Sequence, residues 1–154
     1  MSYPRWITEP DDSMNLREVA PHLYVGAEAS PLRGGWHTII DFYGHAPSRV
    51  QPAYKLAKRY VKVPFEDGSV FPHGALDQAW VAWQVADAEG GETLIHCQAG
   101  LSRSASAAYA FLQKRYGLSR FDALKRITVP GYEGYAPRER TIQSADTWAR
   151  GNNK

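Results

Sequence analysis

The chain has 154 residues, of which 44% are hydrophobic and 22% charged, proportions typical of a globular protein with one buried core. This composition excludes a disordered tail and a fibrous repeat, and the length argues against several domains. The formal net charge of +2 suits an anionic substrate but is too small to indicate nucleic-acid or membrane binding.

A single cysteine, Cys97, excludes an intramolecular disulfide and a cysteine-based zinc finger, and it suits a reducing compartment. The first residues lack the apolar core of a signal peptide. The most apolar stretch, Ala79 to Ala88, is interrupted by Gln84 and Asp87 and is shorter than the ~20 residues that a membrane-spanning helix needs. We therefore expect a soluble cytoplasmic protein.

The N-terminal part of the chain combines a polar segment with two predicted strands. Residues Met1 to Ala20 are polar and rich in turn-forming residues, which predicts an arm over the domain rather than a core element. His22–Gly26 and Thr38–Tyr43 are short apolar runs with β-branched residues, as expected of strands. Residues 27–35 between them are predicted to form a short helix and a turn.

The middle of the chain alternates helix and strand. Val50–Arg59 is predicted to form a helix that leads into a strand, Tyr60–Val63, which Pro64 ends. After a loop, apolar residues recur every three or four positions from His73 to Ala88, the pattern of an amphipathic helix. Thr93–His96 follows as a short buried strand.

Three further helices complete the predicted domain. After a loop through Arg103, an alanine-rich helix extends to about Tyr116, Ser119 caps a second helix through Ile127, and Pro137–Ala149 forms the last. Strands alternating with helices predict a single α/β domain with a mainly parallel sheet of four to five strands and helices on both faces. We assign residues 1–20 to the arm and residues 21–150 to the domain.

The segment that connects the last predicted strand to the alanine-rich helix has the composition of an anion-binding loop. Backbone N–H groups of such a loop converge, and the first helical turn adds unpaired N–H groups and partial positive charge, so a tetrahedral phosphate fits there. The predicted phosphate-binding residues are Gln98, Ala99, Gly100, Leu101, Ser102 and Arg103.

Three side chains of this loop indicate covalent phosphate chemistry. The field that binds phosphate also stabilises the thiolate of Cys97 at the start of the loop, which makes it a nucleophile. The planar fork of Arg103 can hold two phosphate oxygens and stabilise the transition state. The hydroxyl of Ser104 can donate a hydrogen bond to the sulfur when the phosphoenzyme breaks down.

The sequence His-Cys-x-x-Gly-x-x-Arg-Ser, from His96 to Ser104, resembles the signature of cysteine-dependent protein tyrosine phosphatases, and most closely that of small dual-specificity phosphatases. The resemblance covers roughly residues 21–127. It implies that Cys97 attacks phosphorus, Arg103 holds the phosphate and His96 orients the loop. It also implies an aspartate general acid on a separate loop, for which it points to Asp67.

The choice of Asp67 also has a physical argument, because it follows a strand that proline ends and precedes Gly68, and thus sits on a loop at a sheet edge. Glu66 is its close competitor. Asp41, at the end of another strand, is a third candidate, for which a role in closing or tuning the site is favoured.

The leading functional hypothesis is a metal-independent protein phosphatase, without cofactor, that acts on phosphotyrosine and on phosphoserine or phosphothreonine. We expect a monomer whose partner is a phosphorylated protein or peptide, with no role for nucleic acid or membrane. Dephosphorylation of RNA 5′ ends or of phosphoinositides is the alternative among enzymes. A catalytically silent module that binds phosphoproteins is the alternative from another class.

Overall fold

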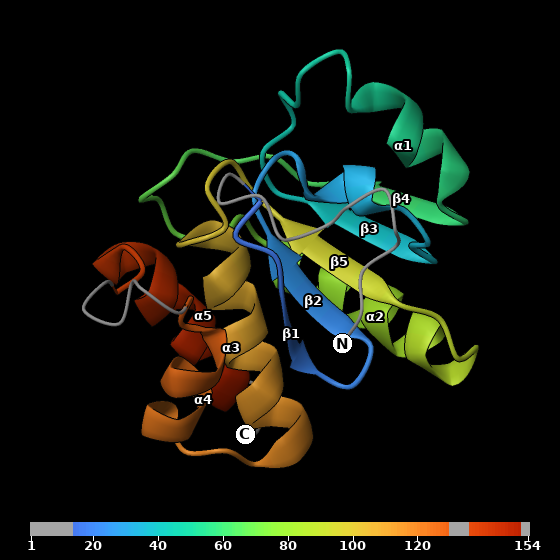
Figure 1. Ribbon diagram of the computed structural model, residues 1–154. Coiled ribbons are helices and arrows are strands. Elements are labelled where there is room, and N and C mark those ends of the chain that lie inside the picture. The colour runs from blue at the N-terminus through green and yellow to red at the C-terminus, as the bar shows by residue number, and fades with distance from the viewer. Residues whose placement is uncertain (1–13, 130–135, 152–154) are drawn as a thin grey trace.

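A five-stranded sheet forms the centre of the molecule, which is described by a computed structural model over residues 14–129 and 136–151 (Figure 1). Its strands lie in the order β1 (Arg17–Ala20), β2 (Leu23–Gly26), β5 (Thr93–His96), β3 (Thr38–Asp41) and β4 (Arg59–Lys62). Only the edge pair β1 and β2 is antiparallel, and the other pairs are parallel. The predicted α/β fold with a mainly parallel sheet is therefore confirmed.

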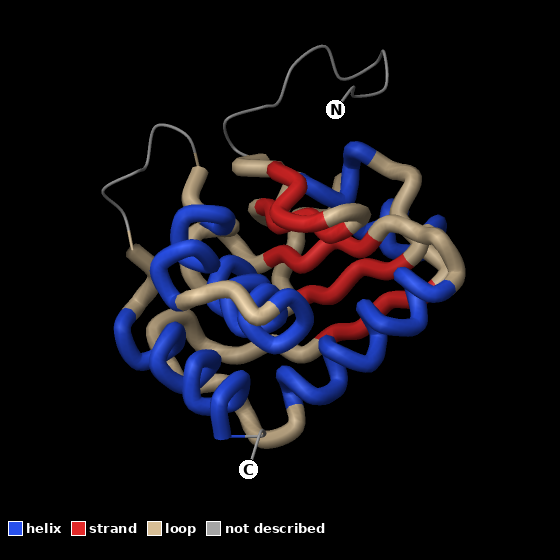
Figure 2. Tube along the Cα trace, turned by 90° about the horizontal axis from the view of Figure 1, so that it is seen from below, coloured by secondary structure: helices blue, strands red, loops and turns tan. Residues whose placement is uncertain are grey.

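Helices cover both faces of this sheet (Figure 2). One face packs against α2 (Ala75–Ala88) and α3 (Arg103–Tyr116), and α4 (Arg120–Ile127) and α5 (Glu139–Gly151) pack on α3. The 3-10 helix η1 (Ser30–Arg33) and α1 (Gln51–Leu56) lie on the other face. Because side chains alternate along a strand, each central strand contributes to two cores.

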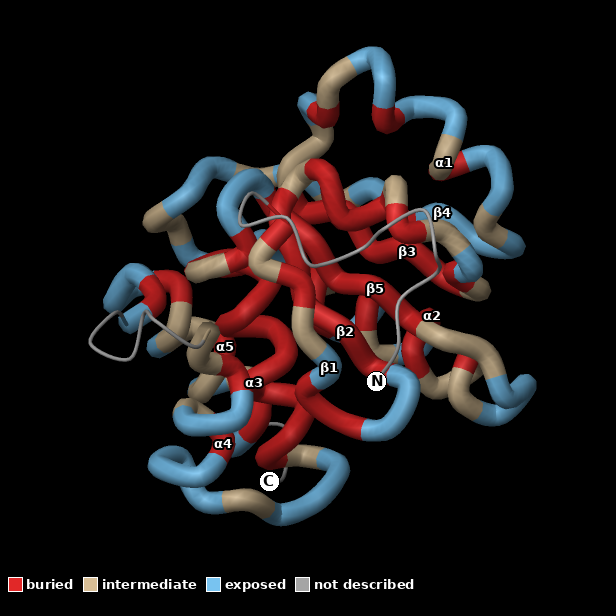
Figure 3. Tube along the Cα trace, viewed as in Figure 1, coloured by how far each residue is buried: buried red, intermediate tan, exposed pale blue. Residues whose placement is uncertain are grey.

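The larger core lies between the sheet and α2–α5 and contains Val25, Ile40 and Ile95, whereas Tyr24, Ile39 and Leu94 face the smaller one. The central strands are buried, and exposed residues gather on α1 and the outer loops (Figure 3). Helix α3 is buried from its first residue to position 113, and its alanines allow close packing on the sheet. This packing fixes the start of α3 beside the end of β5.

The structure differs most from the sequence predictions at three places, and ends of other elements shift by one or two residues. Residues 17–20 of the predicted arm form β1, with Val19 and Ala20 buried, whereas residues 1–13 lie outside the described residues. Two inward-facing side chains were too short a pattern to reveal an edge strand. Helix α1 ends at Leu56, earlier than predicted, because the parallel register pairs Arg59 with Thr38 as the start of β4. The predicted helix in residues 27–35 is a single 3-10 turn.

Candidate active site

The carboxyl ends of the parallel strands bring four segments of the chain together. Gly26, His96 and Asp41 occupy the same level of the sheet, and Asp41 also pairs with Lys62 of β4. The loops that follow these residues therefore leave the same edge. Open α/β sheets bind ligands at this edge.

The loop after β5 forms a cradle whose backbone N–H groups can bind an anion. Cys97 ends the strand region and Arg103 begins α3, with Gly100 between them at φ +74°. A Cβ atom on Gly100 would lie 2.6 Å from the carbonyl carbon of Gly26, so the loop rests directly on the end of β2. Among the described residues, the backbone N–H groups of residues 98–102 have no acceptor. Ser102 caps α3 without a side-chain bond to the helix, so its hydroxyl does not occupy the N–H groups of the first turn.

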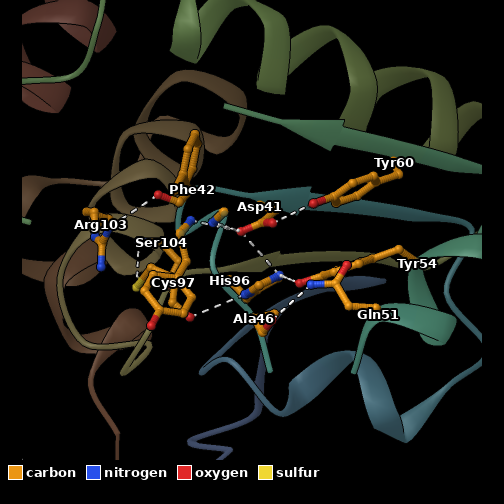
Figure 4. Close-up of polar contacts among 12 residues, drawn as sticks. Asp41, Phe42, Ala46, Gln51, Tyr54, Tyr60, His96, Cys97, Arg103 and Ser104 are labelled. Carbon is orange, nitrogen blue, oxygen red and sulfur yellow. Dashed lines mark hydrogen bonds and ion pairs between the residues drawn. The ribbon is translucent and has the colours of Figure 1, made fainter. Parts of the chain in front are cut away.

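The sulfur of Cys97 lies at the floor of this cradle, beside Ser104 (Figure 4). Sγ is 3.2 Å from Ser104 Oγ and 3.5 Å from the Ser104 backbone nitrogen. The Cys97 side chain is buried, as is that of Ser104. Both donors suit a negatively charged sulfur, because each can direct a hydrogen towards it.

The guanidinium of Arg103 is anchored on one side and free on the other. Its Nη1 donates to the carbonyls of Phe42, at 3.2 Å, and Phe65, at 2.7 Å. Its Nε is buried and has no hydrogen-bond partner in the described part of the chain, and Asp67 Oδ1 lies 3.8 Å from it. The other oxygen of Asp67 lies 3.6 Å from Arg138 Nε. The free Nε edge is therefore the part of the fork that is available to an oxyanion.

A cleft of about 510 Å³ opens above Arg103. It is lined by Tyr43, His45, Pro64, Phe65, Glu66, Asp67, Gln98 and Arg103. The structure thus brings Asp67 and its competitor Glu66 to the same cleft, but the carboxylate of Asp67 forms the ion pairs with arginines. Sequence reasoning missed Tyr43 and His45, whose position just after a strand end was the available signal.

Asp41 is buried, and both of its carboxylate oxygens accept hydrogen bonds (Figure 4). One oxygen accepts from the backbone N–H groups of Tyr43 and Gly44, at 2.8 and 2.9 Å. The other accepts from Tyr60 Oη at 2.6 Å. These bonds fix the β3–α1 loop, in agreement with a tuning role for Asp41 rather than with proton donation to a substrate.

His96 is fully buried between this carboxylate and the cysteine. Its Nδ1 lies 3.2 Å from the Cys97 carbonyl oxygen, and its Nε2 lies 3.0 Å from Tyr54 Oη and 3.5 Å from Asp41 Oδ1. Burial lowers the pKa of His96, although the Asp41 carboxylate opposes this effect. Burial likewise raises the pKa of Tyr54. A neutral imidazole that donates from Nδ1 to the Cys97 carbonyl would hold the start of the loop.

Two further features of the described residues bear on the kind of site. Within these ranges, no three histidine, cysteine, aspartate or glutamate side chains gather as a metal centre would require. Likewise, no helix between residues 14 and 129 or between 136 and 151 has the length and apolarity to cross a membrane.

The sequence matches the family described as dual specificity phosphatase, catalytic domain, over residues 40–143. Human dual specificity protein phosphatase 8 is 28% identical over 127 residues, which cover 77% of this chain and 20% of that protein. Mouse dual specificity protein phosphatase 14 is 28% identical over 132 residues, which cover 78% of this chain and 62% of that protein. The crystal structure of human DUSP28 is similar with a TM-score of 0.71 at 23% identity, covering 99% of both chains.

These similarities differ in how much of each protein they cover and in what they show. The match over residues 40–143 includes the cysteine loop and the Asp67 loop. The chain spans about a fifth of the length of dual specificity protein phosphatase 8. The likeness to human DUSP28, at 23% identity, concerns the fold.

Proposed function

The chain belongs to the dual specificity phosphatase family, and from that membership we propose that it hydrolyses phosphotyrosine and phosphoserine or phosphothreonine in proteins through a cysteinyl-phosphate intermediate. The observation that carries the proposal is the position of Cys97 Sγ, 3.2 Å from Ser104 Oγ, at the floor of a loop with unpaired N–H groups. A phosphate monoester fits this combination of nucleophile and anion site.

In the first step, the Cys97 thiolate attacks phosphorus and the bond from phosphorus to the ester oxygen breaks. The N–H groups of residues 98–102 and the free Nε edge of Arg103 stabilise the charge on the equatorial oxygens. Asp67, protonated in this step, gives its proton to the leaving oxygen. Asp67 lines the same cleft as Arg103, and the mechanism assigns the leaving oxygen to this side.

In the second step, water attacks phosphorus and the bond between phosphorus and sulfur breaks. The Asp67 carboxylate takes the proton from water, and inorganic phosphate is released. Ser104 donates a hydrogen bond to the departing thiolate, for which its 3.2 Å distance to Sγ is suitable. His96 positions the loop through the Cys97 carbonyl and does not touch the phosphate.

We assign the substrate to the phosphoprotein class because the residues between Cys97 and Arg103 are uncharged. RNA ends and phosphoinositides carry additional phosphates that favour basic residues within the loop. The cleft volume of about 510 Å³ is within the range of ordinary ligand pockets. A monomer in the cytoplasm, where the thiol of Cys97 stays reduced, is part of the same proposal.

Hydrolysis of p-nitrophenyl phosphate in the presence of a chelator tests the chemistry, with vanadate as inhibitor and Cys97→Ser as the comparison. We expect vanadate-sensitive turnover in the parent protein and none in the variant, which should still bind phosphate. Substantial turnover by Cys97→Ser would contradict the covalent mechanism. Phosphate binding without turnover in the parent protein would instead indicate a silent binding module.

Substrate class needs a second set of measurements. Peptides of one sequence that carry phosphotyrosine, phosphoserine or phosphothreonine are compared with an RNA bearing a 5′ phosphate and with a soluble phosphoinositide. We expect the highest kcat/KM for a phosphopeptide. A higher kcat/KM for the RNA or the phosphoinositide would move the protein to that substrate class.

A further inference from the structure

Three successive carbonyl groups of the phosphate-binding loop are held from outside the cradle. The Gln98 carbonyl accepts from the backbone N–H of Glu28 at 2.9 Å. The Ala99 carbonyl accepts from Asn15 Nδ2 at 2.7 Å, and the Gly100 carbonyl accepts from Arg17 Nη1 at 2.8 Å. Two of these three donors are side chains that precede the first residue of the predicted domain.

These outer bonds determine where the inner N–H groups point. In a planar trans peptide, the carbonyl and the following N–H point in opposite directions. An outward carbonyl at Ala99 therefore directs the N–H of Gly100 into the cradle, and an outward carbonyl at Gly100 does the same for Leu101. Neither N–H has an acceptor within the part of the chain that the structure describes.

Arg17 connects the loop to the two elements behind it. Besides the Gly100 carbonyl, its Nη1 donates to the Asn15 carbonyl at 2.7 Å, and its Nε donates to the Ile127 carbonyl at 3.2 Å. Ile127 ends α4, where the carbonyls carry partial negative charge that favours a cation. One guanidinium thus joins β1, the phosphate-binding loop and the end of α4.

The charge of Arg17 has no carboxylate partner among the described residues, since its hydrogen bonds all go to carbonyls. Burial lowers the pKa of Arg17 to about 10, and attraction to an ionised Cys97 opposes that change. A guanidinium with this pKa remains protonated at neutral pH. This charge lies against the Gly100 carbonyl, in the loop that begins at Cys97.

We propose that Asn15 and Arg17 form an outer clamp that holds the phosphate-binding loop with its N–H groups directed inward and supplies a second positive charge near Cys97. Both are positioning residues, because they contact the loop carbonyls and not the phosphate. The proposal rests on the proposed function for its effect on turnover. Its effect on the cysteine itself can be measured separately.

The test compares Arg17→Met, Arg17→Lys and Asn15→Gly with Arg126→Met. Glycine tolerates the left-handed conformation of Asn15, φ +43°, and removes the amide donor together with the rest of the side chain. Arg126 is the matched control because it also joins α4 to β1, through the Val19 carbonyl at 3.1 Å, and does not contact the loop. Melting temperatures establish that each variant is folded.

The first readout is the rate of alkylation by iodoacetate, a small anion, which reports on Cys97 alone because the chain has no other cysteine. At neutral pH we expect Arg17→Met to slow alkylation by about three- to tenfold, since thiolate formation and anion binding both weaken. Arg17→Lys should retain most of the rate, because its point charge remains. Arg126→Met should react as the parent does.

The second readout is kcat/KM for p-nitrophenyl phosphate. We expect losses of about tenfold for Asn15→Gly and about tenfold or more for Arg17→Met. These losses are smaller than the roughly 100- to 1,000-fold loss for removal of an oxyanion donor itself, because the two residues only position such donors. Arg17→Lys should lose part of the turnover despite its charge, because lysine cannot reach the Gly100 and Ile127 carbonyls together.

Folded Arg17→Met and Asn15→Gly proteins that match Arg126→Met in both rates would overturn the clamp. If Arg17→Met does not fold, the comparison of Asn15→Gly with Arg126→Met alone tests the clamp. An inactive parent protein in which Arg17→Met still slows alkylation would refute the proposed phosphatase activity and support the clamp. An active parent protein whose Arg17→Met and Asn15→Gly variants keep the parent rates would support the phosphatase activity and refute the clamp.

Discussion

The carboxylate of Asp67 lies 3.8 Å from Nε of Arg103, and that Nε has no hydrogen-bond partner among residues 14–129 and 136–151. Phosphate bound on the free edge of Arg103 would therefore lie next to the proposed proton donor. Arg138, 3.6 Å from the other Asp67 oxygen, holds the carboxylate from the solvent side. Geometry thus favours Asp67 over Glu66, although both line the cleft.

Asp67→Asn tests this assignment through the pH–rate profile. With phosphotyrosine we expect kcat to fall about 100-fold or more, because the phenol leaves without a proton donor. The basic limb of the profile should disappear. Glu66→Gln is the matched control, and a lost basic limb in that variant instead would make Glu66 the acid.

Arg103→Lys tests the bidentate role of the guanidinium. A lysine amine can bond the Phe42 or Phe65 carbonyl but cannot also present two parallel donors to phosphate. We expect kcat/KM to fall by about 1,000-fold and the affinity for vanadate to fall with it. Arg115→Lys, on the same helix and paired with Asp87, should leave both quantities near those of the parent. Comparable losses in the two variants would indicate a general effect on α3.

Ser104→Ala tests the second chemical step. Without the hydroxyl, 3.2 Å from Sγ, the thiolate becomes a poorer leaving group, and we expect phosphoenzyme hydrolysis to slow by about tenfold or more. Phosphoenzyme formation should change less, so rapid-quench experiments should show a burst of p-nitrophenol. Ser106→Ala, which removes a buried hydroxyl that has no hydrogen-bond partner among the described residues, is the control. Absence of a burst combined with slower formation would place Ser104 in the first step.

His96 should give the folded state a defined dependence on pH. Its pKa is lowered in the folded protein relative to its ordinary value of 6.5, mainly by burial, so the unfolded chain binds more protons just below that pH. The contribution of His96 to the free energy of unfolding should therefore be complete above about pH 6.5. It should be lost as the pH drops towards the pKa of His96 in the folded protein.

Urea unfolding at a series of pH values measures this dependence. The slope below about pH 6.5 should be smaller in His96→Asn, whatever that variant's stability at neutral pH. His73→Asn, at an exposed position, should keep the parent slope. An unchanged slope in His96→Asn would mean that other groups carry the pH dependence.

The cysteine loop was predictable from sequence because its chemistry is local. A strand, a cysteine, a glycine and an arginine follow one another without a spacer, and β5 was predicted to the residue. Helix α3 begins at Arg103, which was predicted to be the last residue of the loop. The family resemblance drawn from this segment is confirmed. The roles of the individual side chains remain predictions.

Contacts between side chains and backbone carbonyls could not be predicted from the sequence in this way. The carbonyls of Phe42 and Phe65 that anchor Arg103 depend on the register of β3 beside β4, and a carbonyl looks the same at every position of a sequence. The same reason explains why Arg17 was missed, since all its acceptors are carbonyls. Asp41 could be noticed at a strand end, but its burial under Tyr60 appears only in three dimensions.

Gly100 offers a test of how tightly the cradle is constrained, with Gly90 as its match. Both have φ +74°, so alanine at either site costs about 1–2 kcal/mol of backbone strain. A Cβ on Gly90 meets nothing within 4 Å, whereas on Gly100 it would lie 2.6 Å from the Gly26 carbonyl carbon and 2.8 Å from the Ala27 nitrogen. Backbone atoms of a central strand cannot yield, so the loop itself must move.

We therefore expect Gly100→Ala to lower the melting temperature more than Gly90→Ala does. It should also reduce kcat for p-nitrophenyl phosphate by about tenfold or more, because the displaced loop no longer directs its N–H groups at one point. Gly90→Ala should lower the melting temperature but leave kcat near that of the parent. Thermal unfolding and turnover of both variants measure these effects. Equal activity in the two variants would mean that the loop can shift away from Gly26 without loss of the cradle.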